Sequence, residues 1–517
     1  MVVKITSGSI QGIEVETVEI ETDIQPRQES PDPAANTTRF SIIGLPDAAV
    51  RESRDRVRSA LTCNDLRWPF ANITINLAPA ALRKSGALYD LPIALGVMAG
   101  CGMLEPSSLA DTMIVGELGL NGEIRGIHGA LPLATHAASL GLRKLLLPAE
   151  NAEEAAAANG IEVYGVRHLM EAVEFLQGRI GLLPTQTDAA ALLETSLQGL
   201  PDFLDVKGQE SAKRALQIAA AGNHNLLMIG PPGCGKSLIA NRLPGIMPPL
   251  SLEEALEVSK IYSAAGLLPP SPGLITARPF RSPHHTVSDA GLLGGGNGIP
   301  RPGEITFAHR GVLFLDELPE FRRNVLEALR QPLENGTVTV ARAAGAFVFP
   351  CRFMLIAAMN PCPCGFAGSR THTCKCSPLQ VATYRSRISG PLLDRIDMHI
   401  ELSPLPQDVL AAPRHGEDSA TMRARVVAAR RRQQERFAGT PVPDNAGIYG
   451  VWLDKFCTLD EAGRQFLNNA MTARHMSARS YDRILRVART CADLAGREEI
   501  AVEDIAEACQ YRVLDKG

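Results

Sequence analysis

The chain has 517 residues, of which 45% are hydrophobic and 21% are charged, and its formal net charge is −4. This length predicts about three domains, and the net negative charge excludes a uniformly basic surface, so any contact with nucleic acid must come from local patches. The sequence contains no run of about eighteen apolar residues and no signal peptide, which predicts a cytoplasmic protein without membrane contact.

Residues 1–178 have the pattern of an α+β domain. Between residues 10 and 24 apolar and charged side chains alternate, which predicts half-buried strands. The further elements that we expect are a helix over 48–63 rich in arginine, a strand over 71–77, an apolar helix over 90–101, a hairpin over 116–124 with Asn121-Gly122 at its turn, and helices over 132–140 and 153–159. For the arginines of the first helix we expect a solvated face, with a DNA contact as the alternative.

Four segments of this domain stand out: Asn76–Pro79, Leu91–Leu95, Gly116–Leu118 and Leu146–Asn151. Together they resemble the Lon-type proteolytic domain, which has a ribosomal S5 domain 2-like fold and is found in magnesium-chelatase-like ATPases. The resemblance implies a Ser–Lys dyad, but its two positions correspond to Leu88 and Leu131, which cannot act as nucleophile or base. Ser85 and Lys84 lie outside the matching positions. We therefore expect a non-proteolytic platform or interaction module.

After a linker over 179–201, residues 202–404 contain the motifs of an ATPase core. A phosphate-loop motif follows the apolar run 226–229 and precedes a helix, which is the context that this motif requires. Its glycines let main-chain N–H groups surround phosphate oxygens, Lys236 reaches the β- and γ-phosphates, and the Ser237 hydroxyl is a ligand for Mg²⁺. We therefore predict that ATP and Mg²⁺ bind here. The expected nucleotide-binding residues are Gly230, Pro231, Pro232, Gly233, Cys234, Gly235, Lys236 and Ser237.

A second apolar strand, over 311–315, ends in two carboxylates, Asp316 and Glu317. After a phosphate loop this pair predicts hydrolysis, with Asp316 in the Mg²⁺ shell and Glu317 orienting and deprotonating the attacking water. The alternative is a buried strand that merely ends in two exposed acids. A third apolar strand, over 353–359, ends at the amide side chain of Asn360.

These motifs, the order of the domains and the segments Phe280–His285 and Met359–Gly365 resemble the ComM/YifB family of magnesium-chelatase-like AAA+ ATPases over essentially the whole chain. The resemblance implies an α/β P-loop AAA+ core with a helical lid and a sensor-1 role for Asn360. It also implies an arginine finger at Arg395, with Arg387 as the second choice. A finger that completes a neighbour's pocket requires an oligomer, which we expect to be a hexameric ring.

The resemblance further implies an activity, because this family is associated with natural transformation. We expect an ATP-driven helicase or translocase that acts on single-stranded or branched DNA and promotes branch migration in homologous recombination. Two alternatives stay open: a chelatase-type ATPase that remodels a protein partner without DNA, and a protease-like unfoldase. The leucines at both dyad positions count against the unfoldase.

The resemblance also implies a central pore, and two segments are candidates for pore elements that grip DNA. Residues 336–348 alternate on both sides of a small-residue turn, which predicts a hairpin with Arg342 beside its tip. A structural hairpin with a solvated arginine is the alternative. Residues 278–301 combine many glycines with Arg281, His284 and His285 and predict a second pore element, in which neutral histidines would contribute hydrogen bonds.

Eleven cysteines in a chain of this length predict free thiols and one candidate metal site instead of a disulfide scaffold. Cys362 and Cys364 form one close pair, and Cys374 and Cys376 form another. Four thiolates in two pairs could hold a structural Zn²⁺. Because the one-residue gap within each pair is shorter than usual, zinc and free cysteines are both open.

Residues 405–517 are expected to form a helical lid that resembles the magnesium-chelatase C-terminal domain. A helix over 421–437 carries six arginines, for which a solvated face is a commoner arrangement than a phosphate contact. A second helix is expected over 481–495. Arg479, just before it, matches the sensor-2 position that contacts ATP from the lid, with Arg483 as the alternative.

Overall fold

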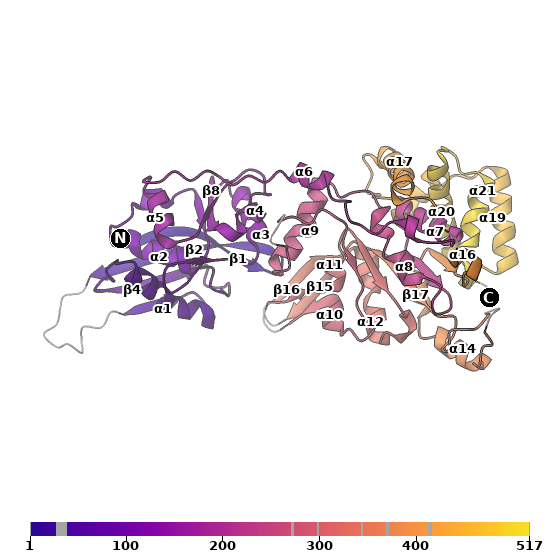
Figure 1. Ribbon diagram of the computed structural model, residues 1–517, viewed down its shortest axis with the longest axis horizontal. Helices are drawn as coiled ribbons and strands as arrows, with labels where there is room; N and C mark the ends of the chain where they lie inside the picture. The colour runs from indigo at the N-terminus through magenta and orange to yellow at the C-terminus, as the bar shows by residue number, and fades with distance from the viewer. Residues whose placement is uncertain are drawn as a thin grey trace. The chain divides into compact units, whose positions relative to one another are not determined.

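The computed structural model describes residues 2–26, 39–269, 273–296, 299–342, 345–368, 372–411, 413 and 416–515. The chain folds into two compact units, Met1–Glu194 with Ser251–Thr276 and Thr195–Leu250 with Ala277–Gly517 (Figure 1). Each unit contains one large β-sheet, and the fold is α/β as predicted.

The large sheet of the first unit is mixed, with strand order β3-β4-β2-β1-β5-β8-β9. β2 pairs antiparallel with β1 and β4, and all other neighbours in this sheet pair parallel. The strands are β1 Val2–Gln11, β2 Glu14–Pro26, β3 Phe40–Ile43, β4 Ala71–Ala78, β5 Thr112–Ile114, β8 Lys144–Pro148 and β9 Glu162–Val166. From Val18 to Asp23 fully buried and partly buried positions alternate along β2, which confirms the half-buried strand predicted from the sequence.

The N-terminal helices of the first unit are α1 Ala48–Cys63, α2 Asp90–Gly100, α3 Ala130–Ser139, α4 Ala152–Ala155, α5 Leu169–Leu176 and α6 Ala189–Glu194, and β6 Glu117–Leu118 pairs with β7 Ile124–Arg125. The bounds of α1, α2 and α3 lie within two residues of those predicted, whereas α4 covers only part of the predicted 153–159. Asp47 caps α1 by accepting a hydrogen bond from the Val50 N–H (2.9 Å). Gly122 has φ +91° at the predicted Asn-Gly turn. The solvated face predicted for the α1 arginines is wrong at Arg56, which donates two hydrogen bonds to the buried Asp90.

One helix of this unit comes from the stretch predicted as ATPase core. α9, Leu252–Ala264, packs against α3, and the Gly129 N–H donates to the Ser263 carbonyl oxygen (3.0 Å). The apolar side chains of Val258 and Ile261 on α9 are buried. The range 202–404 therefore contains a segment that packs with the N-terminal unit, an arrangement that the linear order of motifs does not reveal.

The two positions that correspond to the Lon dyad are apolar and at least partly buried. Leu131 is fully buried, and Leu88 packs against the core of this unit. Lys84 is also buried and donates a hydrogen bond to the Pro79 carbonyl oxygen. Burial lowers the pKa of Lys84. Neither leucine offers a nucleophile or a base, and the ammonium group of Lys84 is held by a main-chain oxygen.

The large sheet of the second unit is entirely parallel, with strand order β11-β14-β17-β10-β18. The strands are β10 Leu226–Ile229, β11 Phe280–Arg281, β14 Val312–Leu315, β17 Met354–Met359 and β18 Met398–Glu401. β10, β14 and β17 are buried at every residue, as expected when helices cover both faces of a parallel sheet. Their carboxyl ends meet at one edge, because Ile229 pairs with Met359 and Leu315 pairs with Ala357.

The other helices and strands of the ATPase core, which is called the motor below, surround this sheet. They are α7 Glu210–Gly222, α8 Lys236–Ala240, α10 Asp289–Leu293, α11 Glu304–Phe307, α12 Arg323–Ala328, α13 Arg330–Asn335, α14 Pro378–Arg385 and α15 Gly390–Leu393, with hairpins β12 Gly294–Gly295 to β13 Arg301–Pro302 and β15 Thr337–Arg342 to β16 Gly345–Pro350. The β15–β16 pairing confirms the predicted hairpin, although Ala343 and Ala344 at its tip lie outside the described residues.

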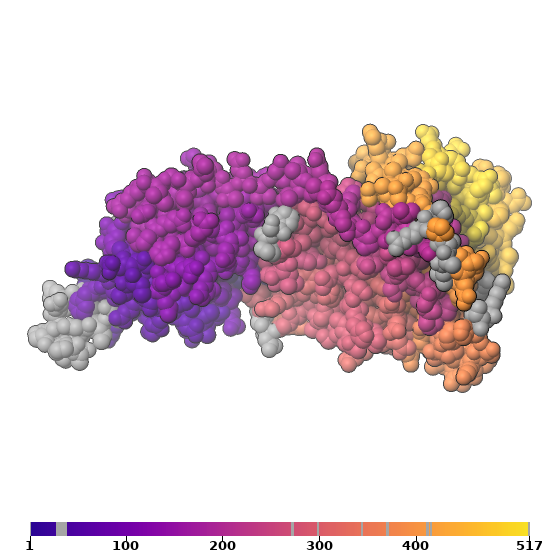
Figure 2. Space-filling view, viewed as in Figure 1, coloured from indigo at the N-terminus to yellow at the C-terminus, as the bar shows by residue number. Residues whose placement is uncertain are grey.

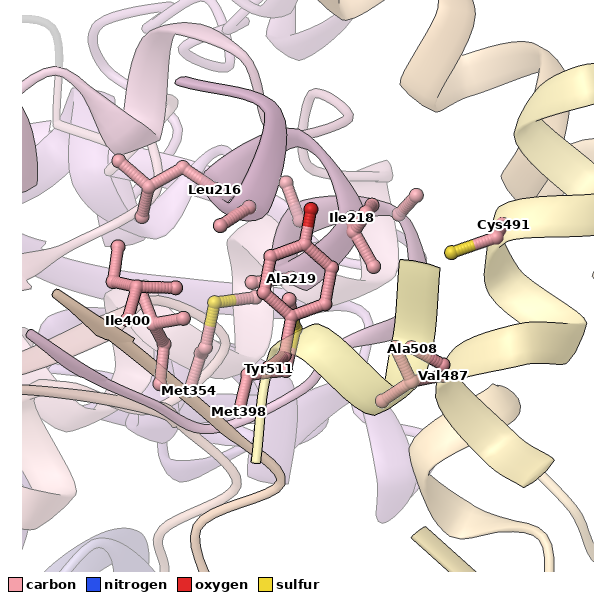
Figure 3. Packing of buried hydrophobic residues seen from close by; sticks show 14 of the residues in the cluster. Leu216, Ile218, Ala219, Met354, Met398, Ile400, Val487, Cys491, Ala508 and Tyr511 are labelled. Carbon is pink, nitrogen blue, oxygen red and sulfur yellow. The ribbon is translucent and has the colours of Figure 1, made fainter. Parts of the chain in front are cut away.

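The lid is helical, as predicted. Its helices are α16 Gln407–Ala411, α17 Ser419–Phe437, α18 Val451–Phe456, α19 Glu461–Arg474, α20 Ala478–Ala495 and α21 Val502–Gln510. α17 and α20 both pack on α7, and the orange and yellow atoms of the lid lie beside the magenta atoms of the core in Figure 2. Side chains of the lid, Val487 and Tyr511 among them, share one apolar core with Leu216 of α7 and Met398 of the sheet (Figure 3).

The solvated face predicted for α17 is wrong for several of its arginines. Arg423 donates to the Gly245 carbonyl oxygen (2.7 Å), and Arg436 donates to both carboxylate oxygens of the fully buried Asp493. Arg423 thus fixes the lid to the ATPase core, and Arg436 fixes α17 to α20 within the lid.

Within the parts of the chain that the structure describes, no helix is both long and apolar enough to cross a membrane.

Candidate functional site

The phosphate loop connects β10 to α8 at the carboxyl edge of the parallel sheet. Gly233 and Gly235 have φ +77° and +91°, a region that disfavours residues with a Cβ. The Lys236 side chain is buried and turns back over the loop. Its ammonium group donates to the carbonyl oxygens of Gly230 (2.7 Å) and Pro231 (3.0 Å) and to Asn360 Oδ1 (3.2 Å). The loop, the lysine and the amide that ends β17 are thus brought together.

Ser237 and Asp316 form a second contact across the same edge. The Ser237 hydroxyl donates to Asp316 Oδ2 at 2.6 Å. The two side chains offer adjacent hard oxygens of the kind that Mg²⁺ prefers. They would hold the ion beside the phosphate loop, where it would supply charge neutralisation for phosphate oxygens.

Glu317 occupies an unusual backbone conformation. Its φ is +54°, a left-handed value that non-glycine residues adopt mainly where the surrounding structure imposes it, and such residues cluster at active sites. Its carboxylate is half exposed, and one oxygen lies 3.1 Å from His285 Nδ1. The His285 ring also stacks near the ring of His284, with 4.0 Å between centroids. The sequence suggested both histidines as DNA contacts and gave no sign that His285 meets Glu317.

Arg281 has a partner within the same unit. It donates to both carboxylate oxygens of Glu304 (2.7 and 2.8 Å), and its guanidinium lies 5.5 Å from the centroid of the Phe307 ring. A bidentate pair of this kind orients arginine strongly. The geometry therefore favours a structural role for Arg281 over the phosphate contact that the sequence suggested.

Arg342 ends β15 and is exposed, whereas Val338 and Val340 on the same strand are buried. A Cβ on Gly295 would lie 3.1 Å from Arg342 Nη2, so the arginine lies directly against β12. The two segments predicted as pore elements, 336–348 and 278–301, thus meet at this point, although residues 297–298 and 343–344 lie outside the described part.

The two finger candidates differ in exposure. The Arg395 side chain is only 19% exposed and pairs with Glu334 of the same chain. The Arg387 side chain is 52% exposed and pairs at 2.9 Å with Glu320, which lies three residues after Glu317. Arg387 therefore needs less rearrangement to reach a neighbouring molecule, although the sequence ranked it second.

The two sensor-2 candidates share one carboxylate. Arg479 is 72% exposed and donates to Asp394, while Arg483 is buried between Asp394 (4.0 Å) and Asp397 (3.8 Å). Burial lowers the pKa of Arg483. The exposed Arg479 is thus the one available to a ligand. Asp394, which the sequence did not single out, links the lid to the segment that carries Arg395.

The four cysteines lie together between β17 and α14, with all Sγ atoms within 4.8 Å of one another. The spacing of two close pairs was the only sequence signal for this cluster.

Comparison with known proteins gives the family. Residues 202–410 match the family described as magnesium chelatase, subunit ChlI, residues 32–151 match subunit ChlI of Mg-chelatase, and residues 416–512 match the ChlI C-terminal family. Competence protein ComM of Haemophilus influenzae is 44% identical over 480 residues, which cover 92% of each chain. The protein YifB of Salmonella typhimurium is 43% identical over 489 residues, again 92% of each chain.

A shorter match links the chain to Lon protease 2 of Bacillus subtilis, which is 30% identical over 157 residues, 26% of each chain. With the parallel sheet, the phosphate loop and the helical lid, these similarities show that the chain belongs to the ComM/YifB family of magnesium-chelatase-like AAA+ ATPases and combines an AAA+ core with a Lon-protease-like domain.

Proposed function

We propose that this protein is an ATP-driven DNA helicase or translocase that works as a ring and promotes branch migration in homologous recombination during natural transformation. One observation carries the DNA part of the proposal: the 44% identity with Competence protein ComM over 92% of each chain. Competence is the capacity to take up DNA. An ATPase that is similar to ComM over nearly its whole length is therefore expected to act on the DNA strand that is taken up.

The pocket supports hydrolysis of ATP. Lys236 would neutralise phosphate charge, and Ser237 with Asp316 would hold Mg²⁺. Glu317, exposed at the end of β14, would orient and deprotonate water, and Asn360 would align that water from the neighbouring strand. Each of these side chains follows a strand of the same parallel sheet or begins the helix after it, which is where ligands bind in such sheets.

A neighbouring copy would complete the pocket. Arg395 or the more exposed Arg387 would reach the γ-phosphate held by the next subunit, and Arg479 would close over the nucleotide from the lid. A contribution in trans requires an oligomer, for which we propose a hexamer. ATP turnover at each interface between subunits would then move the DNA-binding elements of adjacent subunits relative to one another.

DNA would be gripped where β15 meets β12. The exposed Arg342 would bind a phosphate group from a two-stranded hairpin. Val338 and Val340 of the same hairpin are buried, so the hairpin would move together with the ATPase core. The glycines of β12 let the arginine and a strand approach closely. His284 lies in the chain segment before β12 and would contribute hydrogen bonds to the DNA.

The test is strand displacement and branch migration by the full chain, with ATPase activity measured with and without forked DNA. We expect DNA to stimulate turnover in the wild type. Lys236→Ala should abolish ATP turnover, whereas Arg342→Ala should keep basal turnover and lose the DNA response. Arg431→Ala is a matched control, because Arg431 is an exposed arginine that pairs only with the nearby Glu435 among the contacts described.

A second candidate function rests on the match of three chain segments to magnesium chelatase subunit ChlI. In that case the ATPase would remodel a protein partner without DNA. Turnover that is indifferent to DNA and rises with a protein partner would favour this alternative over the helicase.

A further inference from the structure

The cysteine cluster between β17 and α14 has the geometry of a metal site. Cys362 Sγ lies 3.3 Å from Cys364 Sγ and 3.7 Å from Cys374 Sγ, and Cys364 Sγ lies 3.6 Å from Cys374 Sγ. A tetrahedral zinc ion with thiolate ligands at about 2.3 Å places its sulfur atoms about 3.8 Å apart, whereas a disulfide requires about 2.05 Å. The separations therefore fit four ligands around one ion, with Cys376 as the fourth.

Main-chain donors support negative charge on these sulfur atoms. The Ala367 N–H donates to Cys362 Sγ (3.2 Å), and the Cys376 N–H donates to Cys374 Sγ (3.4 Å). Such N–H groups stabilise thiolates, the form in which cysteine binds a metal. The ring of His372, the other potential ligand in the loop, stacks on the Phe366 ring with 4.8 Å between centroids.

The same loop packs directly against the phosphate loop. Gly365 lies between the two cysteine pairs, and a Cβ at its position would be 2.6 Å from Cδ of Pro232. Its φ of +86° also requires glycine. At the start of the loop, Cys362 is fully buried and follows Asn360 by two residues. The cluster is therefore tied to two components of the candidate nucleotide site.

The other end of the loop is fixed to α14. Cys376 immediately precedes Ser377, whose side chain caps this helix in a capping box with Gln380. Arg385, in the last turn of α14, donates to the Pro361 carbonyl oxygen (3.3 Å). An ion held by the four thiolates would thus close a short structural unit between β17 and α14.

We propose that Cys362, Cys364, Cys374 and Cys376 bind one structural Zn²⁺ ion, and that this ion holds the loop against Pro232 so that the phosphate loop is preorganised for nucleotide. Four thiolates leave no open coordination position, so the ion takes no part in hydrolysis. The metal half of the proposal stands on the cysteine geometry alone. The coupling to nucleotide rests on the proposed ATPase function.

The first experiment measures metal. The full chain, purified under reducing conditions without added metal, should contain about one zinc per chain. Cobalt exchanged into the site should show the absorption of a tetrahedral tetrathiolate centre. The double variant Cys364→Ser with Cys376→Ser should lose the zinc, whereas Cys63→Ser, which removes an exposed thiol on α1, should keep it. A wild-type protein with reduced thiols and no zinc, or a double variant that retains zinc, would overturn the proposal.

The second experiment measures nucleotide affinity with a fluorescent ATP analogue and no DNA. The double variant should bind it on the order of tenfold more weakly than the wild type and Cys63→Ser. Circular dichroism of the double variant should match the wild type, and zinc stoichiometry of the wild type tests the site independently if the variant does not fold. Equal affinity in a zinc-free, folded variant would overturn the coupling. Wild-type protein that binds zinc but no nucleotide would overturn the ATPase function and leave the metal site supported.

Discussion

His285 Nδ1 lies 3.1 Å from a carboxylate oxygen of Glu317, the residue proposed to activate water. His285 precedes α10 and β12, the segment against which Arg342 lies. One short stretch of chain therefore contacts the candidate catalytic carboxylate at one end and the candidate DNA-binding arginine at the other. At this distance the imidazole would orient the carboxylate of Glu317, whose backbone has φ +54°.

The first prediction follows from this contact. His285→Ala should lower kcat by roughly tenfold to a hundredfold, because Glu317 loses the group that orients it, and should leave KM for ATP nearly unchanged. His285→Asn, which keeps a hydrogen-bonding side chain, should recover part of the rate. Steady-state ATPase kinetics with and without forked DNA check this. A rise in KM at constant kcat would place His285 in ground-state binding and contradict the prediction.

A second prediction separates the two finger candidates. If Arg395 acts on a neighbour's nucleotide, Arg395→Ala should lower turnover by roughly 10³-fold or more, and subunits with Lys236→Ala should be equally inactive. Mixing the two variants should restore activity at subunit interfaces where the phosphate loop of an Arg395→Ala subunit meets the intact arginine finger of a Lys236→Ala subunit.

The same mixing experiment with Arg387→Ala tests the more exposed candidate. Arg387 and Arg395 each have a carboxylate partner in their own chain, so each variant also loses an internal pair, which mixing with another variant cannot restore. Only the true finger should be rescued in mixed rings. Full activity of a monomeric Arg395→Ala, Arg387→Ala double variant would exclude a shared pocket.

Patterns in the sequence correctly predicted those elements whose structure is determined by residues close together in the chain. β10, the phosphate loop and α8 follow from an apolar run, glycines and a helix start, and α1 has its predicted bounds because Asp47 supplies the cap. The alternation of 336–348 likewise predicted the hairpin, since Val338 and Val340 face inward.

Contacts between distant residues could not be predicted in this way. Arg479 and Asp394 are 85 residues apart, and Arg436 and Asp493 are 57 apart. An arginine-rich helix has the same local pattern whether its charges face water or a buried carboxylate, so the solvated face expected for α17 was wrong where tertiary packing supplied partners. The packing of α9 on the N-terminal unit likewise depends on a surface that is distant in sequence.

A third prediction concerns pH and the junction between motor and lid. Asp397 is buried, which alone would raise its pKa, but the nearby His224 ring and the charges of Arg486 and Arg483 outweigh burial and lower the pKa to about 2. Because this value is below the ordinary 3.8, the carboxylate contributes stability above pH 3.8. That contribution, about 2 kcal/mol, is lost as the pH falls towards 2.

Asp397→Asn should therefore destabilise the second unit near neutral pH, and the difference from the wild type should shrink in acid. Urea unfolding followed by the fluorescence of Trp452 measures this, in a Trp68→Phe background because these are the two tryptophans of the chain. A difference that stays constant from roughly pH 6 down to about 2, a range that includes both the ordinary pKa of 3.8 and the lowered value, would show that the charge of Asp397 is not what stabilises the junction.

The last prediction concerns the salt dependence of DNA binding. A protein that contacts phosphates releases counterions, so the logarithm of its affinity falls linearly with the logarithm of salt concentration, with a slope of about −0.7 per phosphate on single strands. Arg342→Ala should reduce the magnitude of the slope by about 0.7 for each subunit that contacts the strand. Binding should weaken similarly for different sequences, because a phosphate contact does not read bases.

Fluorescence anisotropy with labelled single strands, a non-hydrolysable ATP analogue and salt from roughly 50 to 200 mM measures this. Arg431→Ala controls for the loss of one exposed charge and should leave the slope unchanged. If Arg342→Ala and Arg431→Ala have the same slope as the wild type, the hairpin is a structural element of the motor and the strand is held elsewhere.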